Sequence, residues 1–216
     1  MLMSSSARIL RGAILTLGVT FLFSAAQAAP AYPDSGAFIT ALGKRAIELL
    51  GARGATDEEQ ETRFRALLFE GFAVRKIGKF VLGKYRQSSS TGEVTEFLHL
   101  FEDYIVSLYS SAFRSFSGGT FAVARVVKTR SPQDTMVITH INPDAPGGPT
   151  KVVFQVRNYS GGYKILDVKI QGISMIVTQR DEFTGFIRNN GGEITPLIKA
   201  LRKKMKYLKS RARERQ

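Results

Sequence analysis

The sequence contains no cysteine and no tryptophan, and His99 and His140 are its only histidines. The lack of cysteine excludes disulfides and thiolate metal sites. No HExxH, GxSxG or phosphate-loop pattern occurs, so the common signatures of metalloproteases, serine hydrolases and nucleotide-binding enzymes are missing. Both histidines lie beside apolar residues, a setting more typical of a structural imidazole than of a catalytic one. We therefore expect no catalytic residue, no metal and no cofactor.

One carboxylate keeps an enzymatic alternative open. Asp167 lies between Leu166 and Val168 in an apolar run, where a half-buried carboxylate could serve as a general base. We favour the reading that it pairs with a basic side chain and ties the sheet together, because buried carboxylates are usually paired. The alternative is a small enzyme that uses Asp167 or His140 on an apolar substrate.

The longest early apolar run, residues 14–23, is too short to cross a bilayer as a helix. Arg8 and Arg11 precede it, and Ala26-Gln27-Ala28 follows as a small-residue cleavage pattern. This order is typical of a secretory signal peptide over residues 1–28. An uncleaved anchor is the alternative. The remaining chain is long enough for one domain, which we place at residues 29–201.

Acidic residues are outnumbered by basic ones, and the formal net charge is +13. The excess is concentrated in a C-terminal tail, residues 202–216, which contains eight basic residues and one acidic residue. Because the body carries an ordinary charge, we expect no nucleic-acid partner. The tail could contact an anionic membrane surface or an acidic partner, or be a solvated helix end.

The first part of the chain predicts helices and the middle part predicts strands. Capping boxes at 56–59 and 90–93 start two helices, and apolar residues at helical spacing predict helices over 35–50, 57–72, around 77–82, 91–116, 183–190 and 193–208. Short runs rich in β-branched residues predict five strands over 121–128, 135–141, 151–158, 163–170 and 173–177. Short connections make the strands antiparallel. The fold class is α+β.

Two segments give the sequence a family resemblance. Residues 163–176 read YKILDVKIQGISMI, and residues 179–183 read QRDEF. The pair resembles the signature aromatic-Lys-Ile-x-Asp-Val-x-x-Glu-Gly-Val-Ser, with a trailing Arg-x-x-Phe, of the MlaC or toluene-tolerance auxiliary family. Further similarity lies at Arg63-Phe64, in LGKY at 82–85, and at Gly191-Gly192. Proteins of this family bind phospholipid in the periplasm of Gram-negative bacteria.

The resemblance implies a bent antiparallel sheet of four to five strands, packed with helices around an apolar cavity like a nuclear-transport-factor cone. The two acyl tails of a phospholipid would occupy the cavity. The protein would be a non-enzymatic periplasmic monomer that shuttles lipid between an outer-membrane lipoprotein complex and the MCE-domain protein of an inner-membrane ABC transporter. A hopanoid-type lipid is an alternative cargo, and an adaptor protein with a filled core is an alternative function.

Cavity-lining candidates come from the long predicted helix and from the sheet. Both faces of the strands carry apolar residues, so the sequence does not fix which face lines a cavity. The predicted lining residues are Phe101, Ile105, Leu108, Val137, Phe154, Val156, Ile165, Val168, Ile173 and Met175.

Overall fold

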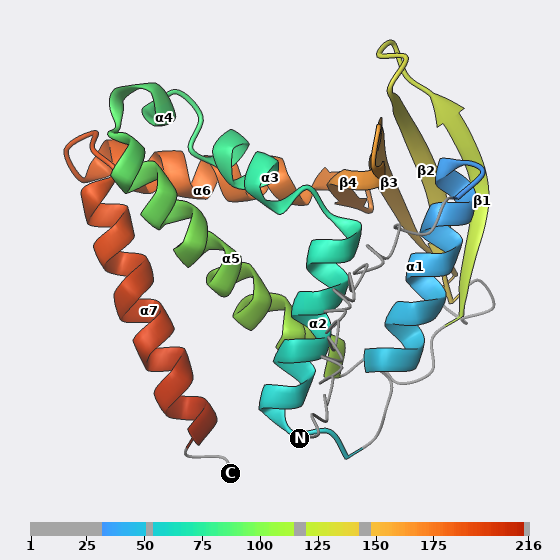
Figure 1. Cartoon of the computed structure of the whole chain (residues 1–216), viewed down its shortest axis with the longest axis horizontal. Helices are drawn as coiled ribbons and strands as arrows, with labels where there is room; N and C mark the ends of the chain where they lie inside the picture. The colour runs from blue at the N-terminus through green and yellow to red at the C-terminus, as the bar shows by residue number, and fades with distance from the viewer. Residues whose placement is uncertain (1–31, 51–53, 115–119, 143–147, 214–216) are drawn as a thin grey trace, which may run out of the picture.

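The computed structural model describes residues 32–50, 54–114, 120–142 and 148–213, and this part of the chain forms seven helices and a five-stranded sheet (Figure 1). The helices are α1 (Ser35–Leu50), α2 (Asp57–Gly71), α3 (Val74–Val81), α4 (Tyr85–Ser88), α5 (Thr91–Arg114), α6 (Met175–Asn189) and α7 (Thr195–Arg213). The strands are β1 (Phe121–Lys128), β2 (Asp134–Ile141), β3 (Thr150–Tyr159), β4 (Gly162–Ile170) and β5 (Ile173–Ser174). The predicted α+β class is confirmed. Residues 1–28, the predicted signal peptide, lie outside the described residues.

Capping boxes start α2 and α5 where the sequence predicts them. The Thr56 hydroxyl accepts a hydrogen bond from the Glu59 N–H, and the Glu59 carboxylate accepts one from the Thr56 N–H. Ser90 and Glu93 repeat this exchange before α5. Glu93 also accepts a 2.7 Å hydrogen bond from the Thr195 hydroxyl, and this bond is the main cause that lowers the pKa of Glu93. The start of α5 is thereby tied to the start of α7.

The strands lie in sequence order, each antiparallel to the next. Helix α1 covers one face of β1, β2 and β3 (Figure 1). The Thr135 hydroxyl donates a 2.7 Å hydrogen bond to the Ser35 hydroxyl, which fixes α1 on this face. The remaining helices lie to the side of this layer, with α2 between α1 and the pair α5 and α7 (Figure 1).

The chain around residue 175 differs from the prediction. The predicted strand 173–177 ends after two residues as β5, and α6 begins at Met175 rather than at Phe183. Gln171 and Gly172 turn the chain with φ of 50° and 87°. The Ser174 hydroxyl then accepts a hydrogen bond from the Val177 N–H at 3.2 Å. Helix capping therefore overrides the strand propensity of the β-branched residues that follow.

Helix α7 runs through the predicted start of the basic tail and ends at Arg213. Leu201 and Met205 are buried against the other helices, whereas Lys203 and Lys206 on the opposite side are exposed. The first part of the tail is therefore the outer face of a packed helix. Among the described residues, no helix is both long and apolar enough to traverse a lipid bilayer.

Glycine-mediated contact between α3 and α5 gives a stability prediction. A Cβ at Gly78 would lie 2.6 Å from Leu98 Cδ2 and 3.1 Å from Phe101 Cδ1, and both side chains are almost fully buried. We expect Gly78→Ala to lower the free energy of unfolding by about 1–2 kcal/mol, because the core must shift. In Gly185→Ala, the control, no atom outside the adjacent residues and the nearby backbone of α6 lies within 4 Å of the new Cβ. This variant should gain about 0.5–1 kcal/mol of stability. Urea denaturation checks both changes, and equal stabilities for the two variants would contradict the close packing.

Candidate functional site

Five predicted lining residues lie on one face of the sheet. Val137 is opposite Phe154, and Phe154 is opposite Val168. Val156 is opposite Ile165, after an extra residue in β4 shifts the register. Directly opposed residues of antiparallel strands point to the same side. The structure therefore settles the face that the sequence leaves open: these five side chains point to the side that α1 covers.

Burial divides these five residues into two groups. Val137, Val156 and Ile165 have no exposed surface and form a cluster with Phe38 and Ile39 of α1. In contrast, Phe154 and Val168 are only partly buried at the margin of this cluster, as are Phe121, Val123 and Tyr163. The sheet face thus has a closed centre under α1 and an incompletely covered apolar margin.

The predicted lining residues of α5 belong to a second apolar cluster. Phe101 is 2% exposed and packs against Phe97 and Phe183, with ring centroids 5.8 Å and 6.2 Å away. Ile105, one turn further along, is partly buried, and Leu108 is 39% exposed. Side chains spaced three and four residues apart lie on one side of a helix. Burial on this side of α5 therefore decreases from Phe101 towards Leu108.

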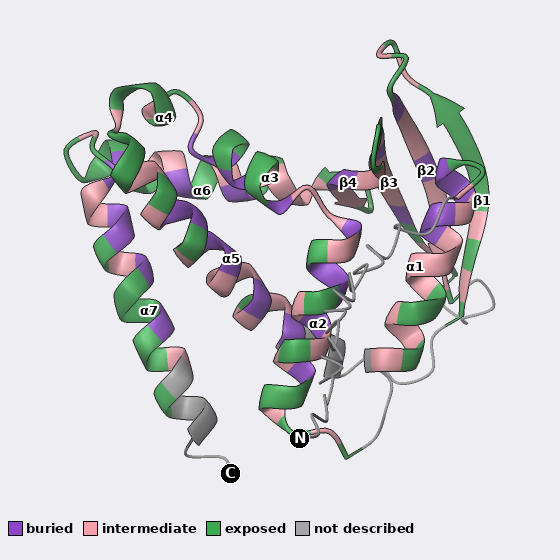
Figure 2. Cartoon of the chain, viewed as in Figure 1, coloured by how far each residue is buried: buried purple, intermediate pink, exposed green. Residues whose placement is uncertain are grey.

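Most of the described buried apolar residues form these two clusters, and Figure 2 shows buried positions along α3, α5, α6 and α7 and where α1 meets the sheet. Leu42 of α1 and Phe72, which follows α2, pack against both clusters. Helix α5 packs mainly against α2, α3 and α7, and its apolar side chains belong to the helical cluster rather than to the one under α1. The sheet and α5 therefore present separate apolar surfaces, joined through the end of α2.

Polar contacts fix the end of α2 to β4. The Ala73 N–H donates a 3.0 Å hydrogen bond to the Ile165 carbonyl oxygen. The Lys164 ammonium donates to the carbonyl oxygens of Phe69 and Glu70 at 2.9 Å and 2.6 Å. A cation at the carbonyl end of a helix is favourable. Burial nevertheless lowers the pKa of Lys164, with Glu70 opposing the shift. The sequence contains Lys164 as part of the family signature but predicts no role for it, because the pattern does not show what a lysine in a strand will contact.

Two predicted lining residues lie away from both clusters. Ile173 is 62% exposed in the edge strand β5. Met175 is the first residue of α6 and is partly buried. The strand predicted for this segment would have placed both side chains in the sheet, and the early start of α6 removes that geometry. Their role as lining residues remains a prediction.

Asp167 and His140, either of which the enzymatic alternative would use, lie apart in the sheet. Asp167 is opposite Gln155, and His140 is opposite Lys151. Gln155 and Lys151 are four residues apart on β3, which corresponds to about 13 Å at about 3.3 Å per residue. Asp167 is buried and accepts a 3.4 Å hydrogen bond from the Ile176 N–H at the start of α6. The expected ion pair of Asp167 is absent from the described residues, which also hold no group of three or more metal-ligating side chains.

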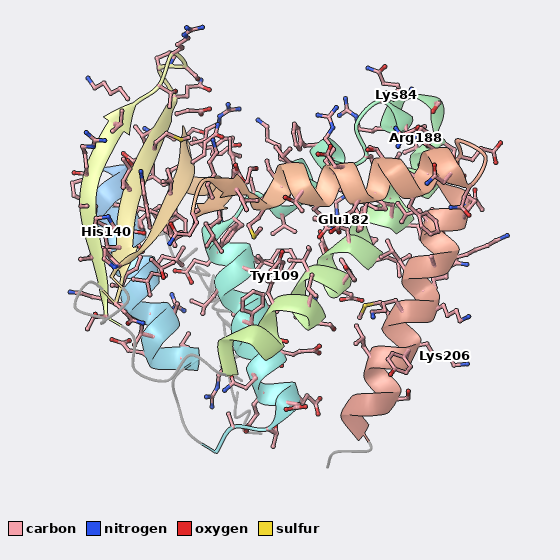
Figure 3. The ribbon with its side chains drawn as sticks, turned by 180° about the vertical axis from the view of Figure 1, so that it is seen from behind. Lys84, Tyr109, His140, Glu182, Arg188 and Lys206 are labelled. Carbon is pink, nitrogen blue, oxygen red and sulfur yellow. The ribbon has the colours of Figure 1, made fainter. Side chains whose placement is uncertain are left out.

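Two tyrosines of α5 add polar atoms at the edge of the helical cluster. Tyr104 and Tyr109 are partly buried. Burial raises the pKa of each hydroxyl, and the charge of Glu182 raises it further. Figure 3 shows Tyr109 beside α2 and α5 and Glu182 on α6 above them. The hydroxyls stay protonated at neutral pH and can donate hydrogen bonds there.

The layers described above define an α+β domain in which an open sheet and a helical cluster present separate apolar surfaces. Comparison with known proteins gives the family: the MlaC protein model matches residues 43–203, and the chain belongs to that family. The predicted family resemblance is confirmed.

A solved structure shares this fold. It is a phospholipid-binding protein from Ralstonia solanacearum in complex with a phospholipid. The TM-score is 0.72 at 16% sequence identity, and the match covers 81% of this chain and 98% of the other. At this identity the match shows a common fold.

An ion pair between Asp134 of β2 and Arg157 of β3 leads to a prediction about the pH dependence of stability. Arg157 donates to both oxygens of Asp134, at 2.5 Å and 2.8 Å, and Gln155 donates to it at 3.1 Å. The Arg157 hydrogen bond is the main cause that lowers the pKa of Asp134. Because the carboxyl pKa is lower in the folded state than in the unfolded state, the charged carboxylate stabilises the fold at pH values above the unfolded-state pKa. This contribution is lost as the pH falls through the folded-state pKa.

We expect Asp134→Asn to cost about 1–2 kcal/mol at pH 7, less than a fully buried pair would, because water reaches part of Arg157. The difference between variant and wild type should shrink as the pH falls from about 5 to about 2. Urea titrations across this range check the prediction. A constant difference would show that the Asp134 charge does not contribute.

Proposed function

We propose that this protein is a lipid carrier that holds the tails of a diacyl phospholipid between the margin of the sheet face and the outer part of α5. The observation that carries the proposal is the pair of separate apolar surfaces, each with partly buried residues at its edge. Membership of the MlaC family and the shared fold of a phospholipid-bound protein support it. A binding role needs no catalytic residue and no metal.

Free energy explains why such a carrier is needed. An acyl chain of about sixteen carbons loses about 12 kcal/mol on transfer from lipid to water, at about 0.8 kcal/mol per CH₂. Unassisted movement of a phospholipid through water is therefore slow. A carrier must provide comparable apolar contact for both chains. Partly buried side chains at the edges of two apolar surfaces can supply this contact when a tail covers them.

Four of the predicted lining residues are best placed for contact with lipid. Phe154 and Val168 are adjacent on the sheet margin, and Ile105 and Leu108 are adjacent on α5. The fully buried residues Val137, Val156, Ile165 and Phe101 support these positions from within the two clusters. We place Ile173 and Met175 at the entrance side, on the edge of the sheet.

The cellular role we propose follows from the family resemblance. Residues 1–28 would direct export to the periplasm. The carrier, acting as a monomer, would exchange lipid with an outer-membrane lipoprotein complex and with the MCE-domain protein of an inner-membrane ABC transporter, and so maintain outer-membrane lipid asymmetry. A hopanoid-type lipid is the alternative cargo, since apolar contacts discriminate poorly between hydrocarbons of similar width.

The proposal predicts a separation of folding from lipid binding. Phe154→Asp places a charge on the sheet margin, where it would contact an acyl chain. We expect a folded protein that purifies without lipid and transfers labelled phospholipid between vesicles at least about tenfold more slowly, because burial of an unpaired charge under hydrocarbon is costly. The measurements are mass spectrometry of an organic extract, a vesicle transfer assay and circular dichroism.

The matched control is Val153→Asp. Val153 is the neighbour of Phe154 in β3, is also partly buried, and points to the opposite face of the sheet. This variant should keep its lipid and its transfer rate. Equal loss of lipid from both variants, with the fold intact, would reject the sheet margin as the binding surface. A wild-type protein that yields no lipid on extraction and transfers none would reject the carrier function.

A further inference from the structure

A concave site lies beside α6, apart from the predicted lipid-lining residues. It is a pocket of about 390 Å³ between the α3–α4 turn and α6. The residues that line it are Phe80, Lys84, Tyr85, Val177, Arg180, Asp181, Thr184 and Arg188. Its volume lies within the range of small-ligand sites. In Figure 3, Lys84 and Arg188 lie close together above α6, whereas Glu182 and Tyr109 lie below it.

Two segments that are far apart in the sequence build this pocket. Residues 82–85 supply the turn, and residues 179–183 supply one side of α6. Both segments are part of the sequence similarity to the family. Contact with acyl chains gives no reason for the charged side chains in them. The charged side chains Lys84, Arg180 and Asp181 therefore need a separate explanation.

The Arg180 guanidinium is held in a defined position. It lies over the Phe80 ring, 4.7 Å from the centroid, in a cation–π contact. The Arg180 guanidinium also lies close to Gly83, which has a φ of +57°. A Cβ at this position would lie 3.3 Å from Arg180 Nε. The glycine therefore serves two purposes, because it permits the left-handed turn and also the close approach of the guanidinium.

The pocket has an excess of positive charge. Lys84, Arg180 and Arg188 contribute three cations against the single carboxylate of Asp181. Within the part of the chain that the structure describes, none of these three cations forms an ion pair with an acidic side chain. Other arginines do, as Arg45 does with Glu70 at 2.7 Å. Unpaired cations around a concave surface favour an anionic ligand.

The arrangement suits a phosphate group in particular. Guanidinium groups present planar, paired N–H donors that match phosphate oxygens, and a lysine adds a mobile point charge. Arg180 is partly buried, whereas Lys84 and Arg188 are exposed at the rim. A phosphate could thus contact one fixed cation and be enclosed by two movable ones. The Asp181 carboxylate would repel it and limit its affinity.

We propose that this pocket binds a phosphate-bearing anion, either the headgroup of a phospholipid at a membrane surface or a free phosphate ester. Tyr85 of the pocket also packs against the helical cluster, but none of the residues that line the pocket is a predicted lipid-lining residue. The proposal therefore stands or falls independently of the carrier function.

The first experiment is calorimetric titration of the full mature chain with glycerol 3-phosphate. The test variant is Lys84→Gln/Arg188→Gln, because both side chains are exposed and their loss leaves the core intact. We expect binding about tenfold weaker than for the wild type, since charge-assisted hydrogen bonds are lost. Asp181→Asn should have the opposite effect and bind more tightly, because a repelling charge is removed.

The matched control is Arg125→Gln/Lys128→Gln. It removes the same two residue types, and both are exposed on β1, which lies at the opposite end of the molecule from α4 (Figure 1). Its affinity should stay within about twofold of the wild type if the pocket, rather than net charge, binds the ligand. Equal weakening in the control and the test variant would overturn the proposal.

The second experiment distinguishes the two sources of phosphate. Flotation with phosphatidylglycerol vesicles, compared with phosphatidylcholine vesicles, measures recognition of a headgroup in a membrane. The ligand is a lipid headgroup if Lys84→Gln/Arg188→Gln loses vesicle binding and the control variant keeps it. This conclusion holds even if glycerol 3-phosphate binds too weakly to titrate. Titration without vesicle binding identifies a free phosphate ester. Binding in neither experiment, or binding that the test variant leaves unchanged, overturns the proposal.

Discussion

The attachment of α2 to β4 joins the two apolar clusters of the protein. The Ala73 N–H and the Lys164 ammonium bind carbonyl oxygens across this joint, and Phe72 inserts between the two clusters. These are short-range contacts at one end of a helix. They attach the sheet to the helices at the end of α2.

A main apolar core accompanied by a smaller cluster is a common arrangement in a domain of this size. Here most of the described buried apolar residues form one cluster where α1 meets the sheet and another among the helices. Residues at the edges of the two clusters, such as Phe154 and Ile105, are left partly buried. A ligand with long hydrocarbon chains would complete their burial.

The sequence predicts the features of this fold that depend on neighbouring residues. Both capping boxes, the antiparallel strand order and the turn at Gln171-Gly172 follow from local patterns. The start of α6 does not, because the capping hydroxyl of Ser174 is followed by β-branched residues that favour a strand. Strand propensity and helix capping compete there, and the sequence alone gives no measure of which is stronger.

The candidate sites show the same limit more clearly. Two apolar faces on each strand leave the orientation of Phe154 and Val168 open until α1 is seen on one side. The spacing of Phe101, Ile105 and Leu108 predicts a common helix face but not the decrease in burial along it. The pocket near Arg180 depends on Gly83 and Phe80, which only the folded chain brings together. Long-range packing, rather than residue type, decides each of these points.

The most direct test of the central claim is to locate a bound acyl chain. The wild-type protein would be loaded with a phospholipid that carries a photoreactive group in the middle of one chain, irradiated, and digested for peptide mass spectrometry. The account predicts adducts in the β3 and β4 peptides that contain Phe154 and Val168, and in the α5 peptide that contains Ile105 and Leu108. Adducts confined to other surfaces of a loaded protein would contradict it.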